Sequence, residues 1–118
     1  MCSSDLPSEL EARFSGWLGS EWQVVLLEYG EVVIGYGIYR LQPDSYFPER
    51  TVVYVRQYFI RREYRGQGLG RAGFELMVEE LFPSPCRILL EALASNPSGL
   101  AFWQHLGFHP YSIALVRE

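Results

Sequence analysis

A glycine-rich turn between a strand pattern and a helix pattern constrains the fold of this chain most. The segment YRGQGLGR at residues 64–71 follows the β-branched and aromatic run TVVYVRQYFI at residues 51–60. Apolar residues at helical spacing then continue from about Leu69 to Phe82. Glycines let backbone amides turn toward one point, and a helix start favours anions, so this pattern predicts a phosphate site. A tight strand-to-helix turn without a ligand would satisfy the same pattern.

The residues before this unit predict a helix and a β-hairpin. Ser8 and Glu11 have capping-box spacing, and apolar residues follow on one helical face, which predicts a helix over residues 9–18. The runs at residues 22–29 and 32–41 are rich in β-branched and aromatic residues and flank a glycine, which is typical of a hairpin. A proline-containing loop then leads to the strand at residues 51–60.

The residues after the glycine turn predict a strand, a helix and a final strand. The near-continuous apolar run at residues 87–93 is typical of a buried parallel strand. Asn96 and Pro97 predict the start of a helix that Gly107 ends, and residues 110–118 predict the last strand. Because a helical crossover joins two parallel strands, the fold class is α/β (α+β). We expect a mixed, mostly antiparallel sheet with helices on both faces, in one domain over residues 1–118.

Charge and composition narrow the possible function classes. The chain has 118 residues, a net charge of -4, ten arginines and no lysine. Five arginines lie within residues 56–71, whereas a nucleic-acid binder is expected to be basic overall. No apolar run is long enough to span a membrane, and Cys2 and Cys86 do not make a disulfide framework. We expect a cytoplasmic protein with no nucleic-acid or membrane partner, and no residue spacing that predicts a metal site.

Two phosphate-binding designs compete for the glycine turn. Gly68, Gly70 and Gly73 match the G-x-G-x-x-G pattern of dinucleotide-binding proteins, and Glu91 follows about twenty residues later. That pattern needs its first glycine at the strand end, whereas the polar segment RREYRGQ separates Ile60 from Gly68. The predicted antiparallel hairpin also departs from successive βαβ units. A Walker A loop is excluded because the chain has no lysine.

The second design rests on a family resemblance. RGQGLG matches the Arg/Gln-x-x-Gly-x-Gly/Ala signature of the GCN5-related N-acetyltransferases, the GNAT family. ILLEALASNPSGLAFWQHLGF at residues 88–108 resembles that family's strand, asparagine and helix ending in Gly-Phe. The resemblance spans residues 22–118 and implies the GNAT-like acyl-CoA acyltransferase fold. Family members commonly carry a further strand and helix before the helix predicted at residues 9–18, so the resemblance implies an N-terminally short version.

The resemblance also implies a site for acetyl-coenzyme A. The amides of the glycine turn would wrap the pyrophosphate, and the end of the strand at residues 51–60 would pair with the pantetheine arm. The second motif would line the course of that arm. By position, the implied residues are Phe59, Ile60, Arg61, Arg65, Gly66, Gln67, Gly68, Leu69, Gly70, Arg71, Asn96, Phe102 and Trp103.

The implied reaction is acetyl transfer from acetyl-coenzyme A to a primary amine of a small molecule or a peptide, by direct attack in a ternary complex. Glu91 resembles the base of some family members, and burial among apolar residues would suit it to taking protons near neutral pH. A structural glutamate held by Arg87 or by backbone amides is the alternative. Many members have a tyrosine twelve residues later that acts as the general acid. This chain has Trp103 at that position, and an indole cannot usefully give up a proton.

This departure leaves other interpretations open. Tyr54, Tyr58 or Tyr111 could replace the missing acid, or water could protonate the leaving thiolate. The protein could instead be a catalytically weak or inactive acyl-CoA-binding module, or a dinucleotide-binding fragment. An open sheet edge usually needs cover, so we also expect a possible homodimer.

Overall fold

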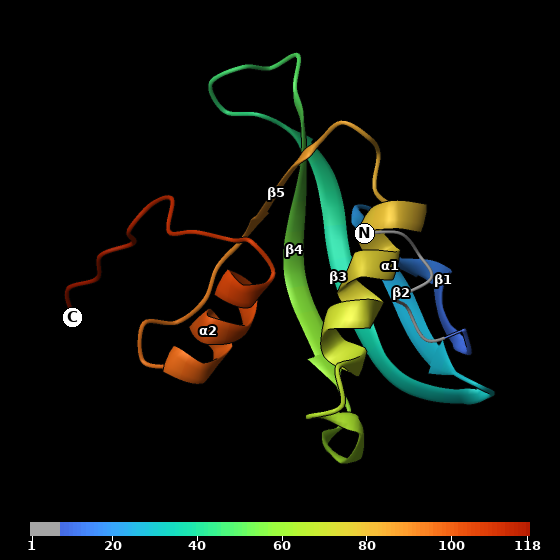
Figure 1. Ribbon diagram of the computed structural model, residues 1–118. Helices are drawn as coiled ribbons and strands as arrows, with labels where there is room; N and C mark the ends of the chain where they lie inside the picture. Colours follow the sequence, from blue (N-terminus) through green and yellow to red (C-terminus); the bar gives the residue numbers. More distant parts are fainter. Residues whose placement is uncertain (1–7) are drawn as a thin grey trace.

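The computed structural model describes residues 8–118 as one sheet with two α-helices (Figure 1). The five strands lie in the order β1-β2-β3-β4-β5; the first four are antiparallel neighbours, and β5 runs parallel to β4. This arrangement confirms the mixed, mostly antiparallel sheet. The elements are, in chain order, β1 (Leu10–Leu18), β2 (Trp22–Tyr29), β3 (Val32–Pro43), β4 (Thr51–Ile60), the 3₁₀ turn η2 (Arg62–Tyr64), α1 (Leu69–Glu80), β5 (Arg87–Leu90) and α2 (Pro97–His105).

The helix predicted over residues 9–18 is wrong, because this segment is strand β1 and pairs along β2. Its apolar residues fit a helical face, yet only Leu10 is buried, and Trp17 is 59% exposed. Gly16 lies at a register shift in β1, and a glycine inside a helix would cost about 1 kcal/mol. Pairing with β2 also satisfies the backbone groups of that strand, so tertiary hydrogen bonding overrides the capping-box signal.

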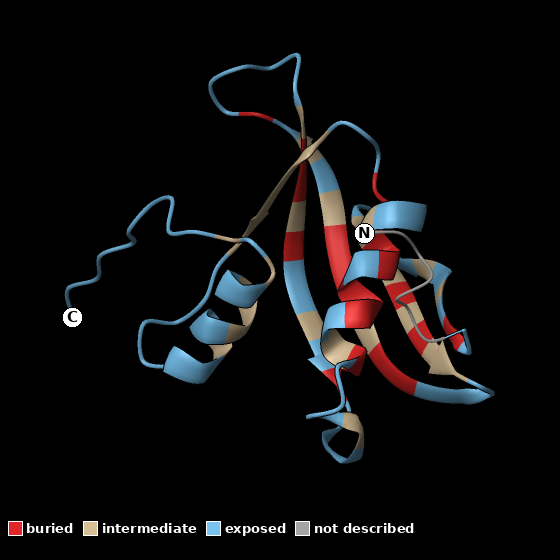
Figure 2. Cartoon of the chain, viewed as in Figure 1, coloured by how far each residue is buried: buried red, intermediate tan, exposed pale blue. Residues whose placement is uncertain are grey.

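The core lies between α1 and one face of the sheet (Figure 2). Alternate residues of β2 and β4 point to this face, and the apolar side of α1 covers them. The best-buried side chains are those of Val25, Leu27, Ile34, Val53, Phe74 and Met77. The predicted hairpin, the strand at residues 51–60 and the helix after the glycine turn are therefore confirmed, each within a few residues.

Both α-helices lie on the same face of the sheet. The ring of Tyr58, in β4, packs against Phe74 of α1 at 5.4 Å and against Phe102 of α2 at 6.4 Å between centroids. The expectation of helices on both faces is therefore met on one face only within residues 8–118. No described helix covers the other face, and one of the three predicted helices, at residues 9–18, forms β1 instead.

The start and end of α2 follow the sequence prediction. The side-chain oxygen of Asn96 accepts a hydrogen bond from the Gly99 amide at 3.2 Å, Pro97 is the first helical residue, and Gly107 follows with a φ of 94°. The predicted strand over residues 110–118 is wrong, because no strand within residues 8–118 pairs with this segment. Its aliphatic side chains are consequently more than 80% exposed at Ile113, Leu115 and Val116.

The cysteines and the helix lengths bear on two expectations, namely no disulfide framework and no membrane span. Cys86 is a free, half-buried thiol, while Cys2 lies outside the described residues. No helix within residues 8–118 is both long and apolar enough to cross a membrane.

Candidate functional site

The glycine turn lies at the end of β4 and leads directly into α1 (Figure 1). The turn η2 separates Ile60 from the glycines, as the polar residues between them indicated. Gly68 is the residue before the first helical turn and has a φ of 81°, a conformation that L side chains rarely adopt. A Cβ atom built on Gly68 would meet no protein atom within 4 Å, so the space beside the turn is open.

The backbone amides of residues 66–71 all lack an acceptor among residues 8–118. The first amide of α1 that is paired belongs to Ala72, which donates to the Gly68 carbonyl at 3.0 Å. A helix start also carries about half a positive charge. Six unpaired donors on an open turn at a helix start therefore form a site suited to phosphate oxygens.

The turn is anchored from behind by Tyr58. Its hydroxyl donates to the Gly70 carbonyl at 2.7 Å, and burial raises the pKa of the Tyr58 phenol far above its ordinary value. The ring of Phe102 lies 3.4 Å from the position that a Cβ atom on Gly70 would occupy. Strand β4 and helix α2 thus both contact the start of α1. Because its proton is held in this bond, Tyr58 is poorly suited to act as an acid.

Three side chains around the turn form bonds within the protein. Arg65 Nε donates to the Ile60 carbonyl at 2.8 Å, and its guanidinium lies over the Phe59 ring at 5.2 Å. Arg61 forms an ion pair with Glu63 at 2.8 Å. Gln67 Nε2 donates to the carbonyl of Glu63 at 3.2 Å. These side chains therefore brace the turn. The positive charge of Arg61 is paired with Glu63, whereas that of Arg65 enters none of the ion pairs within residues 8–118.

Arg71 is the exception in the first turn of α1. Its side chain is exposed, and none of the four ion pairs formed within residues 8–118 includes it. It therefore supplies an available positive charge beside the unpaired amides.

Strands β4 and β5 separate beside this turn. Their parallel pairing covers only Val52–Val55 against Arg87–Leu90, while β4 continues to Ile60. The Arg61 amide donates to Ile34 of β3 at 2.7 Å. Hydrogen-bonding direction alternates along a strand, so the Ile60 amide and carbonyl turn away from β3, toward the gap. Since Arg65 occupies the carbonyl, the Ile60 amide is the donor left for a ligand.

Glu91 lies just beyond β5, at the point where the two strands separate. The strand predicted over residues 87–93 is shorter than expected, so Glu91 is exposed and not enclosed by apolar residues. Its Oε1 atom accepts a hydrogen bond from the Tyr54 hydroxyl at 3.1 Å, not from Arg87 or a backbone amide. Burial, and then the Glu91 carboxylate, raise the pKa of Tyr54 above its usual value.

The second motif contributes three residues to the surroundings of the gap. Asn96 uses its side-chain oxygen as the cap of α2 and also accepts from Ser98 Oγ at 3.1 Å. Phe102 lies beside the start of α1. Trp103 packs edge-on against Tyr58, Phe74 and Phe108, so the position of the usual acid belongs to the aromatic core.

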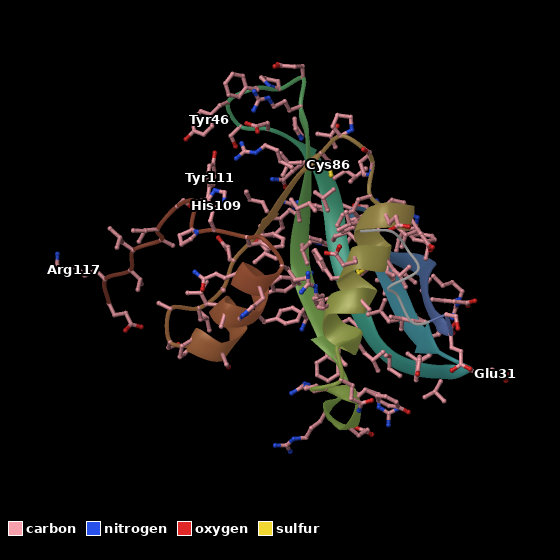
Figure 3. The ribbon with its side chains drawn as sticks, in the orientation of Figure 1. Glu31, Tyr46, Cys86, His109, Tyr111 and Arg117 are labelled. Carbon is pink, nitrogen blue, oxygen red and sulfur yellow. The ribbon has the colours of Figure 1, made fainter. Side chains whose placement is uncertain are left out.

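A hollow at the opposite end of β4 is separate from this site. It is lined by residues of the β3–β4 loop together with Val52, Arg87, Leu89 and Tyr111. Figure 3 labels Tyr46 and Tyr111 at this end, far from the glycine turn. Tyr111 stands over the Arg87 guanidinium at 4.8 Å, so it is removed from the gap beside Glu91. Residues 8–118 contain no group of three His, Cys, Asp or Glu side chains that could hold a metal.

The sequence analysis missed one cluster near the gap. Trp22 stands between the guanidinium groups of Arg40 and Arg56, which lie 4.7 Å and 5.1 Å from its ring centroid, and packs against Tyr54 at 6.2 Å. The alternation of β4, which places Tyr54 opposite the buried Val53 and Val55, was the available signal for Tyr54; Arg56 lies at a register shift that the sequence does not reveal.

Comparisons with known proteins agree with this fold. The model of the acetyltransferase (GNAT) family matches residues 2–108. A search of curated proteins finds no match. A tetramutant of the BH1408 protein from Bacillus halodurans is 20% identical with a TM-score of 0.68, over 85% of this chain and 67% of that one.

Two further solved structures share the fold. The aminoglycoside N-acetyltransferase AAC(6')-Iy, in complex with CoA, is 14% identical with a TM-score of 0.69, over 85% of this chain and 68% of that one. An integron cassette protein of V. cholerae is 19% identical with a TM-score of 0.69, over 85% of this chain and 63% of that one. The chain thus spans about two thirds of the length of these structures. Together with its two sequence motifs, the family match over most of the chain establishes that this protein belongs to the GNAT acetyltransferase family.

Proposed function

We propose that the protein transfers an acetyl group from acetyl-coenzyme A to a primary amine of a small molecule or a peptide, by direct attack in a ternary complex. The observation that supports this proposal is the set of unpaired amides at residues 66–71. They lie beside the gap between β4 and β5. A neighbour in fold, AAC(6')-Iy, is an N-acetyltransferase in complex with CoA, which supports the choice of donor.

The residues present fit such a donor. The six amides and Arg71 would hold the pyrophosphate, because each offers a donor or a charge that the protein does not use itself. The Ile60 amide, Asn96 and Phe102 would line the course toward the gap. Acetyl-coenzyme A would supply an acetyl group activated as a thioester.

Glu91 is the proposed proton acceptor for the amine. The reaction moves one acetyl group from sulfur to nitrogen and one proton from nitrogen to the solvent or to Glu91, while the thiolate takes a proton from water. An exposed carboxylate can do this directly or through one water. The Ile60 amide would donate to the carbonyl oxygen as it gains negative charge. Trp103 contributes packing and not proton transfer, because its indole N–H can donate a hydrogen bond but does not give up its proton near neutral pH.

Two measurements test this proposal in order. The melting temperature is measured with acetyl-coenzyme A and, separately, with NAD; a ligand at 100 times its dissociation constant adds about 2.7 kcal/mol of stability. At roughly 3–6 °C per kcal/mol for a domain of this size, that should raise the melting temperature by roughly 8–16 °C. A shift with NAD alone would contradict the assignment of the site. A thiol-release assay with a panel of amines then measures transfer.

A catalytically inactive acyl-CoA-binding module is the second candidate. The position of Trp103 within the aromatic core favours it, since no hydroxyl stands where many family members have their acid. The two candidates differ in one result: a melting shift with acetyl-coenzyme A but no thiol release with any amine would support the module. A cytoplasmic location and a homodimer remain part of the proposal and rest on the sequence alone.

A further inference from the structure

A bipolar group of side chains flanks the gap on the face that no described helix covers. Val55 and Leu90 are the last paired residues of β4 and β5, so Arg56 and Glu91 are the next residue on each strand. Tyr54 donates to Glu91 at 3.1 Å, and the Trp22 ring joins Tyr54 to Arg56 by packing against both. The residues that carry a fixed cation and a carboxylate therefore lie on either side of the point where the strands separate, and both side chains contact the Tyr54–Trp22 pair.

The positive charge of Arg56 is available, while that of its neighbour is not. Arg40 forms an ion pair with Glu21 and donates to Gln42 Oε1 at 2.9 Å. Arg56 is exposed and enters none of the ion pairs formed within residues 8–118. Stacking on Trp22 holds its guanidinium in place, which reduces the entropy lost when that planar group binds an anion.

We infer that the acceptor is an aminocarboxylate: a small primary amine that carries a carboxylate near the amine. This inference rests on the proposed function and narrows its substrate class. Glu91 faces the ammonium group and takes one of its protons before the attack, and the second proton passes to water as the amide forms. Arg56 binds the carboxylate, most effectively with two parallel hydrogen bonds. An amine without an anionic group leaves Arg56 unpaired, and an N-terminal peptide amine has a neutral carbonyl at that place.

The test compares amines that differ by one carboxylate. Three matched pairs are alanine and ethylamine, 4-aminobutanoate and propylamine, and phenylalanine and 2-phenylethylamine; phenylalaninamide represents a peptide terminus. Thiol release is measured with acetyl-coenzyme A on the wild-type chain, Arg56→Gln and Arg13→Gln. Arg13 lies on β1 and pairs with Glu28, so it controls for loss of an arginine elsewhere on the sheet.

In at least one pair, the wild-type chain should have a clearly higher kcat/KM for the aminocarboxylate. Arg56→Gln should lower that value by about 10- to 100-fold, mainly through KM, since this is what a charged hydrogen bond contributes. The matched amine should change by no more than about twofold in this variant, and Arg13→Gln should keep the wild-type ratio. Without coenzyme, the preferred aminocarboxylate should raise the melting temperature of the wild-type chain but not that of Arg56→Gln.

The possible failures are distinguishable. Equal rates within every pair, or equal loss on all amines in Arg56→Gln, would overturn the inference while transfer itself stands. Equal melting shifts in the wild-type chain and Arg56→Gln would overturn it as well. If none of the amines gives thiol release, the proposed function is refuted, and the inference is refuted with it.

Discussion

Gly35 and Gly37 sit two residues apart in β3 and face different neighbours. A Cβ atom on Gly35 would lie 2.2 Å from the Phe59 carbonyl oxygen, which is backbone of the adjoining strand. A Cβ atom on Gly37 would lie 2.7 Å from Met77 Cε, the free end of a flexible side chain. The first contact cannot relax without moving β4, whereas the second relaxes by a change of rotamer.

We therefore expect Gly35→Ala to lower the free energy of unfolding by about 2–3 kcal/mol or more, and Gly37→Ala by about 1 kcal/mol or less. Urea denaturation of both variants measures the difference. Equal losses would show that the close approach of β3 and β4 at Gly35 is not what limits this position.

Asp44 is a buried carboxylate whose charge stabilises the β3–β4 loop. The Tyr46 amide, at 2.8 Å, followed by the Phe47 amide and Arg87, holds the pKa of Asp44 below its usual value of about 3.9. A lowered pKa in the folded state gives stability that is present above the unfolded pKa and is lost as the pH falls through the folded one. Part of the stability should thus disappear as the pH drops below about 4.

Asp44→Asn should flatten this acid limb, at the cost of lower stability at neutral pH. Melting temperatures between about pH 5 and pH 2 measure the slope, in the range where carboxyl groups titrate. Glu49→Gln, an exposed carboxylate in the same loop, is the control and should keep the wild-type slope. An unchanged slope in Asp44→Asn would exclude this carboxylate as its source.

Single residues were predictable where local geometry decides their role. Asn96 and Pro97 cap α2 as their sequence order indicates, because capping depends on the adjacent amides alone. The exposure of Glu91 was not predictable, since it depends on where β4 and β5 separate. The hydrogen bond from Arg65 to the Ile60 carbonyl was not predictable either, because it forms only when the turn brings these two residues together.

At the scale of elements, ligand binding at the start of α1 should be separable from the stability of the fold by mutation. Gly68 and Gly30 both have positive φ, at 81° and 66°, and a Cβ atom on either would meet no protein atom within 4 Å. Valine at either position should therefore cost a similar amount of stability, at least about 1–2 kcal/mol of backbone strain.

Only Gly68→Val should also abolish the melting shift with acetyl-coenzyme A, because its side chain would occupy the place where a phosphate approaches the amides. The shift in Gly30→Val should equal that of the wild-type chain. Loss of the shift in both variants would point to a general effect of strain, and its retention in Gly68→Val would refute the phosphate site.

Elements whose residue types agree with the observed structure were predicted well, and those with conflicting signals were not. The residues of β2, β3 and β4 are rich in β-branched and aromatic types, and the apolar residues of α1 follow helical spacing. β1 carries a helical capping signal together with strand-forming aromatics, and pairing with β2 decided between them. Residues 110–118 have strand propensity, but a strand requires a partner that propensity cannot report.

At the scale of the whole molecule, the described sheet has two open edges, at β1 and β5. The aliphatic residues after α2 bury little surface, so they contribute little to the stability of one chain. Deleting residues 112–118 should therefore change the melting temperature of a monomer by no more than about 2 °C. Calorimetry at several protein concentrations measures this.

A larger loss that grows with protein concentration would instead show that a second copy covers these residues. Sedimentation of the full chain and the shortened chain would then differ in mass. This result would support the homodimer that open strand edges predict.

The short pairing of β5 with β4 divides the site between two parts of the chain. One part carries Ile60 at the end of β4 and the glycine turn, and the other carries Glu91 and Asn96 between β5 and α2. A ligand lying in the gap would contact both parts. Its binding should therefore reduce local opening of the C-terminal third of the chain. Amide hydrogen exchange should then slow across residues 87–106 when the coenzyme is added, well beyond the atoms that the coenzyme contacts.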